Sequence, residues 1–165
     1  MVFFADREPA GPYRVTVGAR RTPLCALVDE GVAAEWFATT LDAFLILELL
    51  PEDPEDRNTA DGRPATRACA HARLAHMLGG DGETCSPDET RSLAERTVAR
   101  LVERVANGVE RVAGGSPGTV IFAGSGEFLG RFVVRGARVV SLAGEWGPAL
   151  SEAACAYAVA RMAHG

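Results

Sequence analysis

Long hydrophobic runs are missing from this 165-residue sequence. No apolar stretch approaches the roughly 20 residues that a membrane-spanning helix needs. No basic region precedes the short apolar stretch at the start of the chain, as a secretory signal would require. The sequence therefore predicts a protein without a membrane span, and the cytoplasm is its expected compartment.

Positive charge is also scarce, because 17 basic residues face 22 acidic ones and leave a net charge of −5. A broad basic face for nucleic-acid binding is therefore not expected. Hydrophobic residues make up 47% of the chain and charged residues 24%, which is typical of a globular domain. The length suits one compact domain with its own core.

Several motifs of familiar chemistry are absent. The four cysteines form no C-x-x-C pair, so neither a structural zinc site nor a disulfide framework is expected. The P-loop pattern G-x-x-x-x-G-K-[ST] and the serine elbow G-x-S-x-G do not occur. The histidines His71, His76 and His164 have no recognisable nucleophile or acid as a partner. The sequence thus predicts no metal ligand set and leaves the catalytic residues unknown.

Hydrophobic periodicity predicts an α/β domain whose chain falls into three segments. Residues 1–30 form a strand or arm region, with β-prone runs at residues 13–17 and 24–28. Residues 31–116 form a helical segment around an acidic loop at 51–64. Its helices are expected at residues 32–50, 65–78 and 86–113, the last opened by an S-P-D-E capping box.

Residues 117–165 alternate between short apolar strands and helices. Strands are expected at residues 119–123 and 138–142, with helices through residue 132 and at 148–162. Strands that alternate with helices imply a parallel sheet with right-handed crossovers. This closing segment is therefore interpreted as a βαβα unit.

A glycine-rich turn follows the first strand of this unit. Gly124, Gly126 and Gly130 are spaced G-x-G-x-x-x-G, and the next strand has no acidic residue at its end, so a Rossmann site is disfavoured. The turn and the following helix start could hold an anion or a flat ring, or could be purely structural. Glu127 would repel a phosphate. It suits a ribose hydroxyl, a base or an ammonium group, or else it caps the helix.

Two other loops carry candidate binding residues. In N-T-A-D-G-R, Asp61 and Arg63 flank a turn, and an arginine fork suits a phosphate or carboxylate. The alternative is a solvated turn before the next helix. Glu145 and Trp146 follow the carboxyl end of a strand, where open α/β sheets bind ligands. For Trp146 two interpretations stay open: it lines a pocket there, or it merely packs.

Several stretches together resemble one family: VTVGARRTPLCALV, EWFATTLDAFLILELLPED, NTADGRPATRACAHARLAHMLGGD, FAGSGEFLGRFVV and SLAGEWGPALSEAACAYAVARM. In this order they are similar to the C-terminal half of the hydantoinase/oxoprolinase-like proteins of tetrahydromethanopterin-linked one-carbon metabolism. Archaeal relatives of that family include the methanofuran-pathway enzyme that joins an aminomethylfuran diphosphate to glutamyl-tyramine.

The resemblance implies a partial actin-like fold, ribonuclease-H-like and of the sugar kinase and heat-shock ATPase type. It would be the C-terminal half of that fold with a helical insertion. By this likeness Gly124, Ser125, Gly126 and Glu127 bind a ligand. The implied cofactor is ATP, or a diphosphate substrate with Mg²⁺. Further residues fall in matching motifs without an assigned role: Thr39, Thr40, Asp61, Gly62 and Arg63.

Members of that family begin with a D-I-G-G-type phosphate turn and carry a D-x-G-S-T-T-type turn before the region that matches here. Neither turn occurs in this sequence. We therefore expect a half that completes a transferase or nucleotide-binding site for a small molecule. Its partner would be an N-terminal half on a separate chain, or a further copy, and its apolar face would be exposed. The alternative is a non-catalytic binding or scaffold module of the same pathway.

Overall fold

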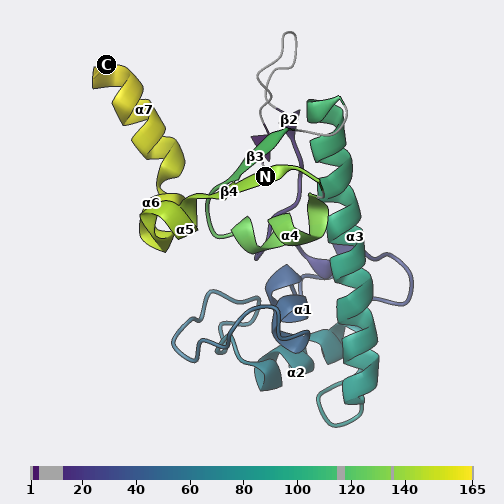
Figure 1. Ribbon diagram of the computed structural model, residues 1–165. Helices are drawn as coiled ribbons and strands as arrows, with labels where there is room; N and C mark the ends of the chain where they lie inside the picture. The colour runs from purple at the N-terminus through teal and green to yellow at the C-terminus, as the bar shows by residue number, and fades with distance from the viewer. Residues whose placement is uncertain (1, 4–12, 115–117, 135, 165) are drawn as a thin grey trace. The chain divides into compact units, whose positions relative to one another are not determined.

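The computed structural model describes residues 2–3, 13–114, 118–134 and 136–164. Its elements, shown in Figure 1, are β1 (Val2–Phe3), β2 (Tyr13–Arg14), η1 (Leu24–Ala26), α1 (Thr40–Ile46), α2 (Arg67–Met77), α3 (Pro87–Ala113), β3 (Thr119–Phe122), η2 (Glu127–Leu129), α4 (Gly130–Val133), β4 (Arg138–Ser141), α5 (Leu142–Trp146), α6 (Pro148–Glu152) and α7 (Ala154–His164). Much of the arm expected within residues 1–30, and the boundary expected after residue 116, lie outside the described residues.

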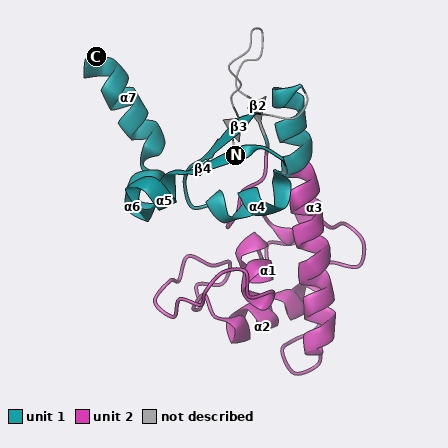
Figure 2. Cartoon of the chain, viewed as in Figure 1, with its two compact units in different colours: residues 1–15, 105–165 teal, residues 16–104 magenta. Residues whose placement is uncertain are grey.

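The chain divides into two compact units, coloured separately in Figure 2. Unit 2 is residues 16–104 and holds η1, α1, α2 and most of α3. Unit 1 is residues 1–15 with 105–165 and holds the strands, the end of α3 and the helices from η2 onward. The helical segment expected at 31–116 therefore contributes to both units. Within the described part of the chain, no helix combines the length and hydrophobicity that a bilayer crossing demands.

The first predicted helix is much shorter than the 32–50 expected. Helix α1 begins only at Thr40, because Thr39 and Asp42 form a capping box that fixes its start. Before it, Thr39 is extended and bridges to Pro23. The helix gives way after Ile46 to Leu47 and then to Glu48, whose φ of 56° is left-handed. Apolar spacing therefore extended the predicted helix over residues that are not buried, such as Trp36 and Phe37.

The β-prone run at residues 24–28 is also not a strand. Its first part forms the 3₁₀ helix η1, in which the amides of Leu27 and Val28 both donate to the carbonyl of Leu24. Leu24 is fully buried, and its own amide donates to the carbonyl of Ala38. Apolar residues here fill the core of unit 2 without forming a sheet ladder.

The other two helices of this segment are confirmed. Helix α2 starts at a Thr66 cap and ends before Gly79, whose positive φ of 78° suits glycine. At the start of α3, Ser86 and Glu89 exchange hydrogen bonds as the capping box predicts. The apolar stripe of α3 is buried at Leu93 and Leu101.

Unit 2 is built around α1, which packs against α2. The side chains of Leu41 and Leu45 pack with Ala65 and Ala70 in a buried cluster. Ala65 closes the base of the acidic loop, because its carbonyl accepts a hydrogen bond from the amide of Asp53. The beginning and the end of the loop between α1 and α2 are therefore joined by this hydrogen bond, next to the buried cluster.

Unit 1 contains the predicted parallel pair, in which β3 lies beside β4 with Val120 opposite Val139. The helix expected at residues 148–162 is divided into α6 and α7, which are separated at Ala153. An unexpected short helix, α5, precedes it and ends at Gly147, whose φ is 84°. The strands β1 and β2 pair antiparallel with each other. The chain therefore combines helices with a two-stranded parallel sheet, in the βαβα order that the sequence predicts.

Candidate functional site

The T-A-D-G-R segment forms a tight turn on the loop between α1 and α2. Gly62 has a φ of 72°, a left-handed conformation that favours glycine. The Asp61 carboxylate accepts hydrogen bonds from the Arg63 amide at 3.0 Å and from its Nε at 2.6 Å. The Thr59 hydroxyl donates to the Arg63 carbonyl at 2.6 Å. The turn thus holds Asp61 and Arg63 as a preformed pair.

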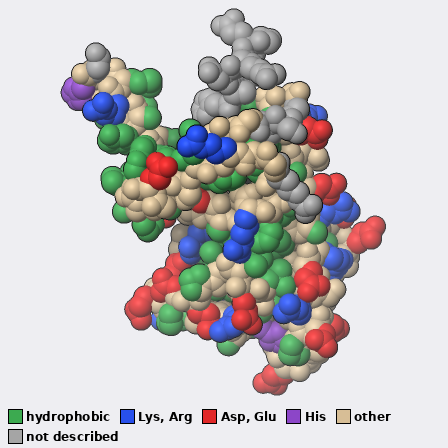
Figure 3. Space-filling model, viewed as in Figure 1, with side chains coloured by type: hydrophobic (Ala, Val, Ile, Leu, Met, Phe, Trp, Pro, Cys, Tyr) green, Lys and Arg blue, Asp and Glu red, His purple; other side chains and the backbone are tan. Residues whose placement is uncertain are grey.

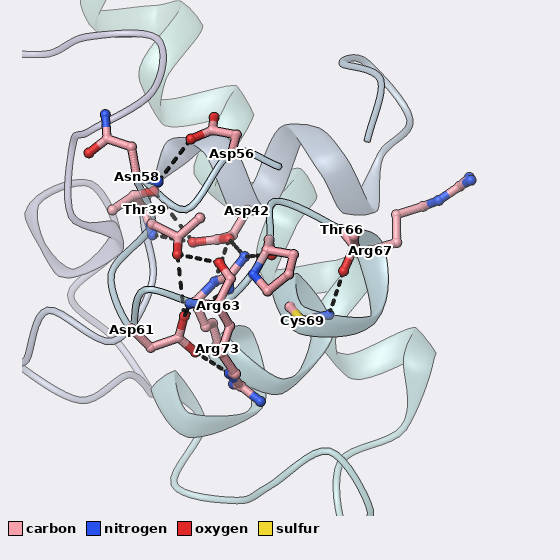
Figure 4. A network of polar contacts seen from close by, with 12 residues as sticks. Thr39, Asp42, Asp56, Asn58, Asp61, Arg63, Thr66, Arg67, Cys69 and Arg73 are labelled. Atoms are coloured by element: carbon pink, nitrogen blue, oxygen red, sulfur yellow. Dashed lines mark hydrogen bonds and ion pairs between the residues drawn. The ribbon is translucent and has the colours of Figure 1, made fainter. Parts of the chain in front are cut away.

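A buried arginine lies beneath this turn, as Figure 4 shows. Arg73, on α2, donates from Nε to Asp42 at 2.8 Å and from Nη1 to Asp61 at 3.0 Å. Its Nη2 also lies 2.7 Å from Asp42. The side chain of Arg73 is 1% exposed and that of Asp61 29% exposed. One guanidinium therefore joins α2, the start of α1 and the loop.

The partners of Arg73 differ in their surroundings. Burial raises the pKa of the Asp42 carboxyl above its ordinary value, against the opposing charge of Arg73 and the hydrogen bond from the Thr39 amide. Burial also acts on Asp61, but the hydrogen bonds from Arg63 and the charge of Arg73 outweigh it and lower its pKa. Burial would lower the pKa of Arg73, yet the two aspartates raise it. The three groups therefore stabilise one another's charges.

Arg63 is the part of this cluster that faces solvent. Its side chain is 48% exposed, and only its Nε is engaged by Asp61. The terminal nitrogens of its guanidinium form no ion pair or hydrogen bond with any described residue. A preoriented arginine fork with free terminal donors can bind a phosphate or a carboxylate in bidentate fashion.

Neither Asp42 nor Arg73 was singled out from the sequence, although both left a signal. Asp42 stands three residues after Thr39 in T-T-L-D, the spacing of a capping box. Arg73 lies among Ala70, Leu74 and Met77, all buried positions of α2. A charged residue on the apolar face of a helix implies a buried counter-charge.

The Gly-Ser-Gly turn lies at the end of β3 in unit 1, and Figure 1 shows it before α4. Gly124 has a φ of 87°, and its amide donates to the Ser151 hydroxyl at 2.8 Å. Ser125 is exposed, whereas Gly124 and Gly126 are partly buried. Gly130 is buried for another reason, since a Cβ there would lie 2.3 Å from the Phe122 ring. Gly124 thus permits a left-handed turn, whereas Gly130 leaves room for the Phe122 ring.

The Glu127 side chain forms its hydrogen bonds within unit 1. Its carboxylate accepts hydrogen bonds from the Ser141 hydroxyl at 2.6 Å and from the Ala143 amide at 2.9 Å. It also accepts one from the Ser151 hydroxyl. These donors come from the end of β4, from α5 and from α6. The carboxylate therefore fastens the turn after β3 to the elements that follow β4.

We expect Glu127→Ala to lower the free energy of unfolding of unit 1 by about 2–3 kcal/mol, because hydrogen bonds to a charged group are lost and their donors stay behind. Urea denaturation followed by Trp146 fluorescence, with Trp36 replaced by phenylalanine, measures this. Glu145→Ala is the matched control, since Glu145 is exposed and should change stability by less than about 0.5 kcal/mol. Unchanged stability of Glu127→Ala would contradict the fastening role.

The predicted binding residues fall into two groups. Asp61 and Arg63 belong to unit 2, with Asp42 and Arg73. Residues 124–127 and Glu145 belong to unit 1.

Glu145 lies on α5 with an exposed side chain. Its neighbour Trp146 packs edge to face against Tyr157, with ring centroids 5.5 Å apart. Each group is organised by contacts within its own unit.

No family model matches the sequence. Over 157 residues the chain is 27% identical to the (4-{4-[2-(gamma-L-glutamylamino)ethyl]phenoxymethyl}furan-2-yl)methanamine synthase of Methanocaldococcus jannaschii, covering 90% of this chain and 48% of the relative. Over 105 residues it is 30% identical to the protein of the same name from Methanococcus vannielii, covering 59% of this chain and 47% of that relative. This chain is similar to two furanmethanamine synthases. It spans about half the length of the curated relatives it matches.

Proposed function

We propose that this chain is the C-terminal half of a furanmethanamine synthase-like transferase of methanofuran biosynthesis. It would complete the active site together with a polypeptide that corresponds to the other half of the relatives. One observation carries the proposal: the similarity runs through 90% of this chain but through only 48% of the Methanocaldococcus jannaschii synthase. A chain that matches about half of a relative along nearly its own whole length fits the role of one component of a two-part enzyme.

The name of the relatives defines the bond to be made. Their product is an ether, in which a phenol oxygen is joined through a methylene to a furan that carries a methanamine. In the proposed reaction the phenol oxygen attacks the methylene carbon, and a diphosphate leaves with the electron pair of the broken C–O bond. The phenol proton passes to a base. The site must therefore bind an anionic leaving group and a gamma-glutamyl substrate with one free carboxylate.

Arg63 is the residue of this chain best suited to that demand. The sequence contains no lysine, so arginine is its long cationic side chain. Arg63 is fixed by Asp61 through Nε, which leaves the outer edge of its guanidinium for an oxyanion. We propose that it binds the diphosphate or a glutamyl carboxylate, which share this chemistry. Arg73 and Asp42 would hold the turn in place from below.

The described carboxylates of the candidate site do not fit a magnesium ion. Asp42 and Asp61 are both paired with Arg73, and no three His, Cys, Asp or Glu side chains among the described residues could hold a metal ion together. The partial actin-like fold, and a nucleotide or ligand contact at residues 124–127, remain part of the proposal. The parallel β3–β4 pair with its intervening helices supports them.

The proposal is tested by making the product. This chain, the polypeptide that matches the other half of the relatives, and the mixture of both are incubated with glutamyl-tyramine and the aminomethylfuran diphosphate. We expect the ether product, detected by mass spectrometry, from the mixture alone. A mixture that forms an intact complex but yields no product would overturn the proposed activity and favour the scaffold alternative.

In the active mixture, we expect Arg63→Ala to lower kcat/KM by about tenfold or more, the loss of one oxyanion contact. Its stability should change by about 1 kcal/mol or less, because the Asp61–Arg63 pair is near the surface. Arg57→Ala is the matched control, as Arg57 is exposed on the same loop and forms no ion pair with any described residue. Equal kinetics for both variants would remove Arg63 from the site.

A further inference from the structure

The parallel pair of unit 1 is too small to be a complete sheet. Among the described residues, β3 and β4 pair only with each other. Parallel sheets are ordinarily covered on both faces and carry apolar residues on both. A sheet of only two strands is marginal in water. The sequence of β3, TVIF, is that of a strand buried on both sides.

Each face of this pair leaves an apolar side chain in water. Along a strand, successive side chains point to opposite faces, so Phe122 and Ile121 lie on different sides. On the first face the Phe122 ring packs over Gly130 at the start of α4, yet Val139, opposite Val120 in the register, is 51% exposed. On the second face Ile121, opposite Val140 in the register, is 64% exposed. An isoleucine in a parallel strand is therefore left in water.

Helix α7 leaves a second apolar surface in water. Its sequence, ACAYAVARMAH, is largely apolar, yet none of its residues is buried. Val159 is 61% exposed and Met162 is 77% exposed, and their i, i+3 spacing places them on the same side of the helix. Leu150, on α6, is also 53% exposed. Figure 3 shows hydrophobic side chains gathered over α5, α6 and α7.

We infer that the face of the β3–β4 pair that carries Ile121, together with the apolar side of α7, is the docking surface for the polypeptide that supplies the other half of the relatives. The inference rests on the proposed function for the identity of the partner and adds the surface that binds it. About half of the relatives' length is unmatched by this chain, which is enough chain to supply further strands. The partner's complementary chemistry is an apolar strand or helix face.

A second copy of this chain fits the surface less well. A two-fold pair of copies places the same patch on both sides of the contact, so the surface would have to be complementary to itself. A copy also brings its own open sheet and its own α7, so the number of uncovered strands doubles. The unmatched half of the relatives is therefore the occupant that the geometry favours.

The test measures association and needs no catalysis. The partner polypeptide is titrated into fluorescently labelled chain carrying Ile121→Glu, or Val159→Glu with Met162→Glu. All three side chains are largely exposed, so circular dichroism should match that of the parent. We expect each variant to raise the Kd by about tenfold or more, the effect of removing a buried apolar contact. Trp36→Glu, an exposed apolar residue of unit 2, is the control and should change the Kd less than about twofold.

The outcomes separate this inference from the proposed function. A Kd unchanged by the unit 1 substitutions would overturn the docking surface, even if the mixture makes product. Failure of the parent chain to bind the partner would also overturn it. Light scattering that shows a homodimer broken by the same substitutions would assign the surface to a second copy. Association lost in the variants with no product from the parent mixture would support the surface and reject the activity.

Discussion

Replacing Arg73 with methionine is expected to lower the free energy of unfolding of unit 2 by about 3–5 kcal/mol, the cost of leaving a buried charge without its partner. Methionine has a long side chain but cannot donate to Asp42, which is fully buried. Asp61 is partly exposed and can turn to water. The loss therefore arises mainly at Asp42. Urea denaturation followed by Trp36 fluorescence, with Trp146 replaced by phenylalanine, measures it.

A double variant separates the charge from the packing. Asp42→Asn removes the charge that needs a cation, and its amide oxygen can still accept the Thr39 amide, as the carboxylate does at 2.8 Å. Asp42→Asn with Arg73→Met should therefore be more stable than Arg73→Met alone, since the residues interact directly. An Arg73→Met protein within about 1 kcal/mol of the parent would contradict the buried ion pair.

The deficit of Arg73→Met should shrink in acid. Burial already raises the pKa of Asp42, and Arg73 opposes that rise. Without Arg73 the folded-state pKa moves further above the unfolded-state value of about 4. Between these two values the folded protein binds more protons than the unfolded one, so stability falls as the pH rises through that window. The difference in Tm from the parent should be smaller at about pH 4.5 than at about pH 7.

Gly130→Val is expected to destabilise unit 1 by about 1–3 kcal/mol or more through overpacking. A Cβ at this position would lie 2.3 Å from Cε2 and 2.4 Å from Cζ of Phe122, well inside the carbon contact distance of about 3.5–4.0 Å. The Phe122 ring, the start of α4 or both must shift to relieve such a contact. Denaturation monitored by Trp146 reports the change.

Gly118→Val provides the matched control for this substitution. A Cβ there would meet nothing within 4 Å, and Gly118 precedes β3 in the same unit. Phe122→Leu combined with Gly130→Val should recover part of the lost stability, because the shorter side chain relieves the clash. Equal destabilisation by the two glycine variants would show that strand or helix propensity, and not the Phe122 contact, determines the effect.

Local patterns predicted the elements whose ends are encoded nearby. Helix α3 begins where Ser86 and Glu89 form their capping box. The strands β3 and β4 coincide closely with the apolar runs at residues 119–123 and 138–142. The start of the helix is decided by two residues close in sequence. The strands are apolar runs that clear turn residues separate from their neighbours. The periodicity alone was then sufficient.

The same patterns failed where the core reaches beyond an element. Residues 32–39 are apolar, but only part of that stretch is buried, and Trp36 and Phe37 are exposed. The run at residues 24–28 is apolar because Leu24 fills the core from a 3₁₀ helix. Apolar composition specifies neither which of these residues are buried nor the backbone conformation that they adopt. Helix and strand are decided there by neighbours distant in sequence.

The candidate sites were predicted in part. Asp61 and Arg63 were found from residue type and the D-G turn, and the structure pairs them directly. Their support by Arg73 joins positions 12 residues apart in sequence, and its pairing with Asp42 spans 31 residues. No local pattern encodes such a pairing. Glu127 was interpreted as a ligand contact or a cap, and the hydroxyls that engage it lie 14 and 24 residues further along the chain.

The carboxylate of Asp42 has a consequence for local opening of unit 2. One of its oxygens accepts the Thr39 amide at the beginning of α1, and the other accepts Arg73 from α2. The first turn of an isolated helix frays readily, but here the fraying of α1 would also release a guanidinium whose other arm holds the Asp61 turn. The onset of one helix, the middle of the next and the loop between them therefore open as a single cooperative step.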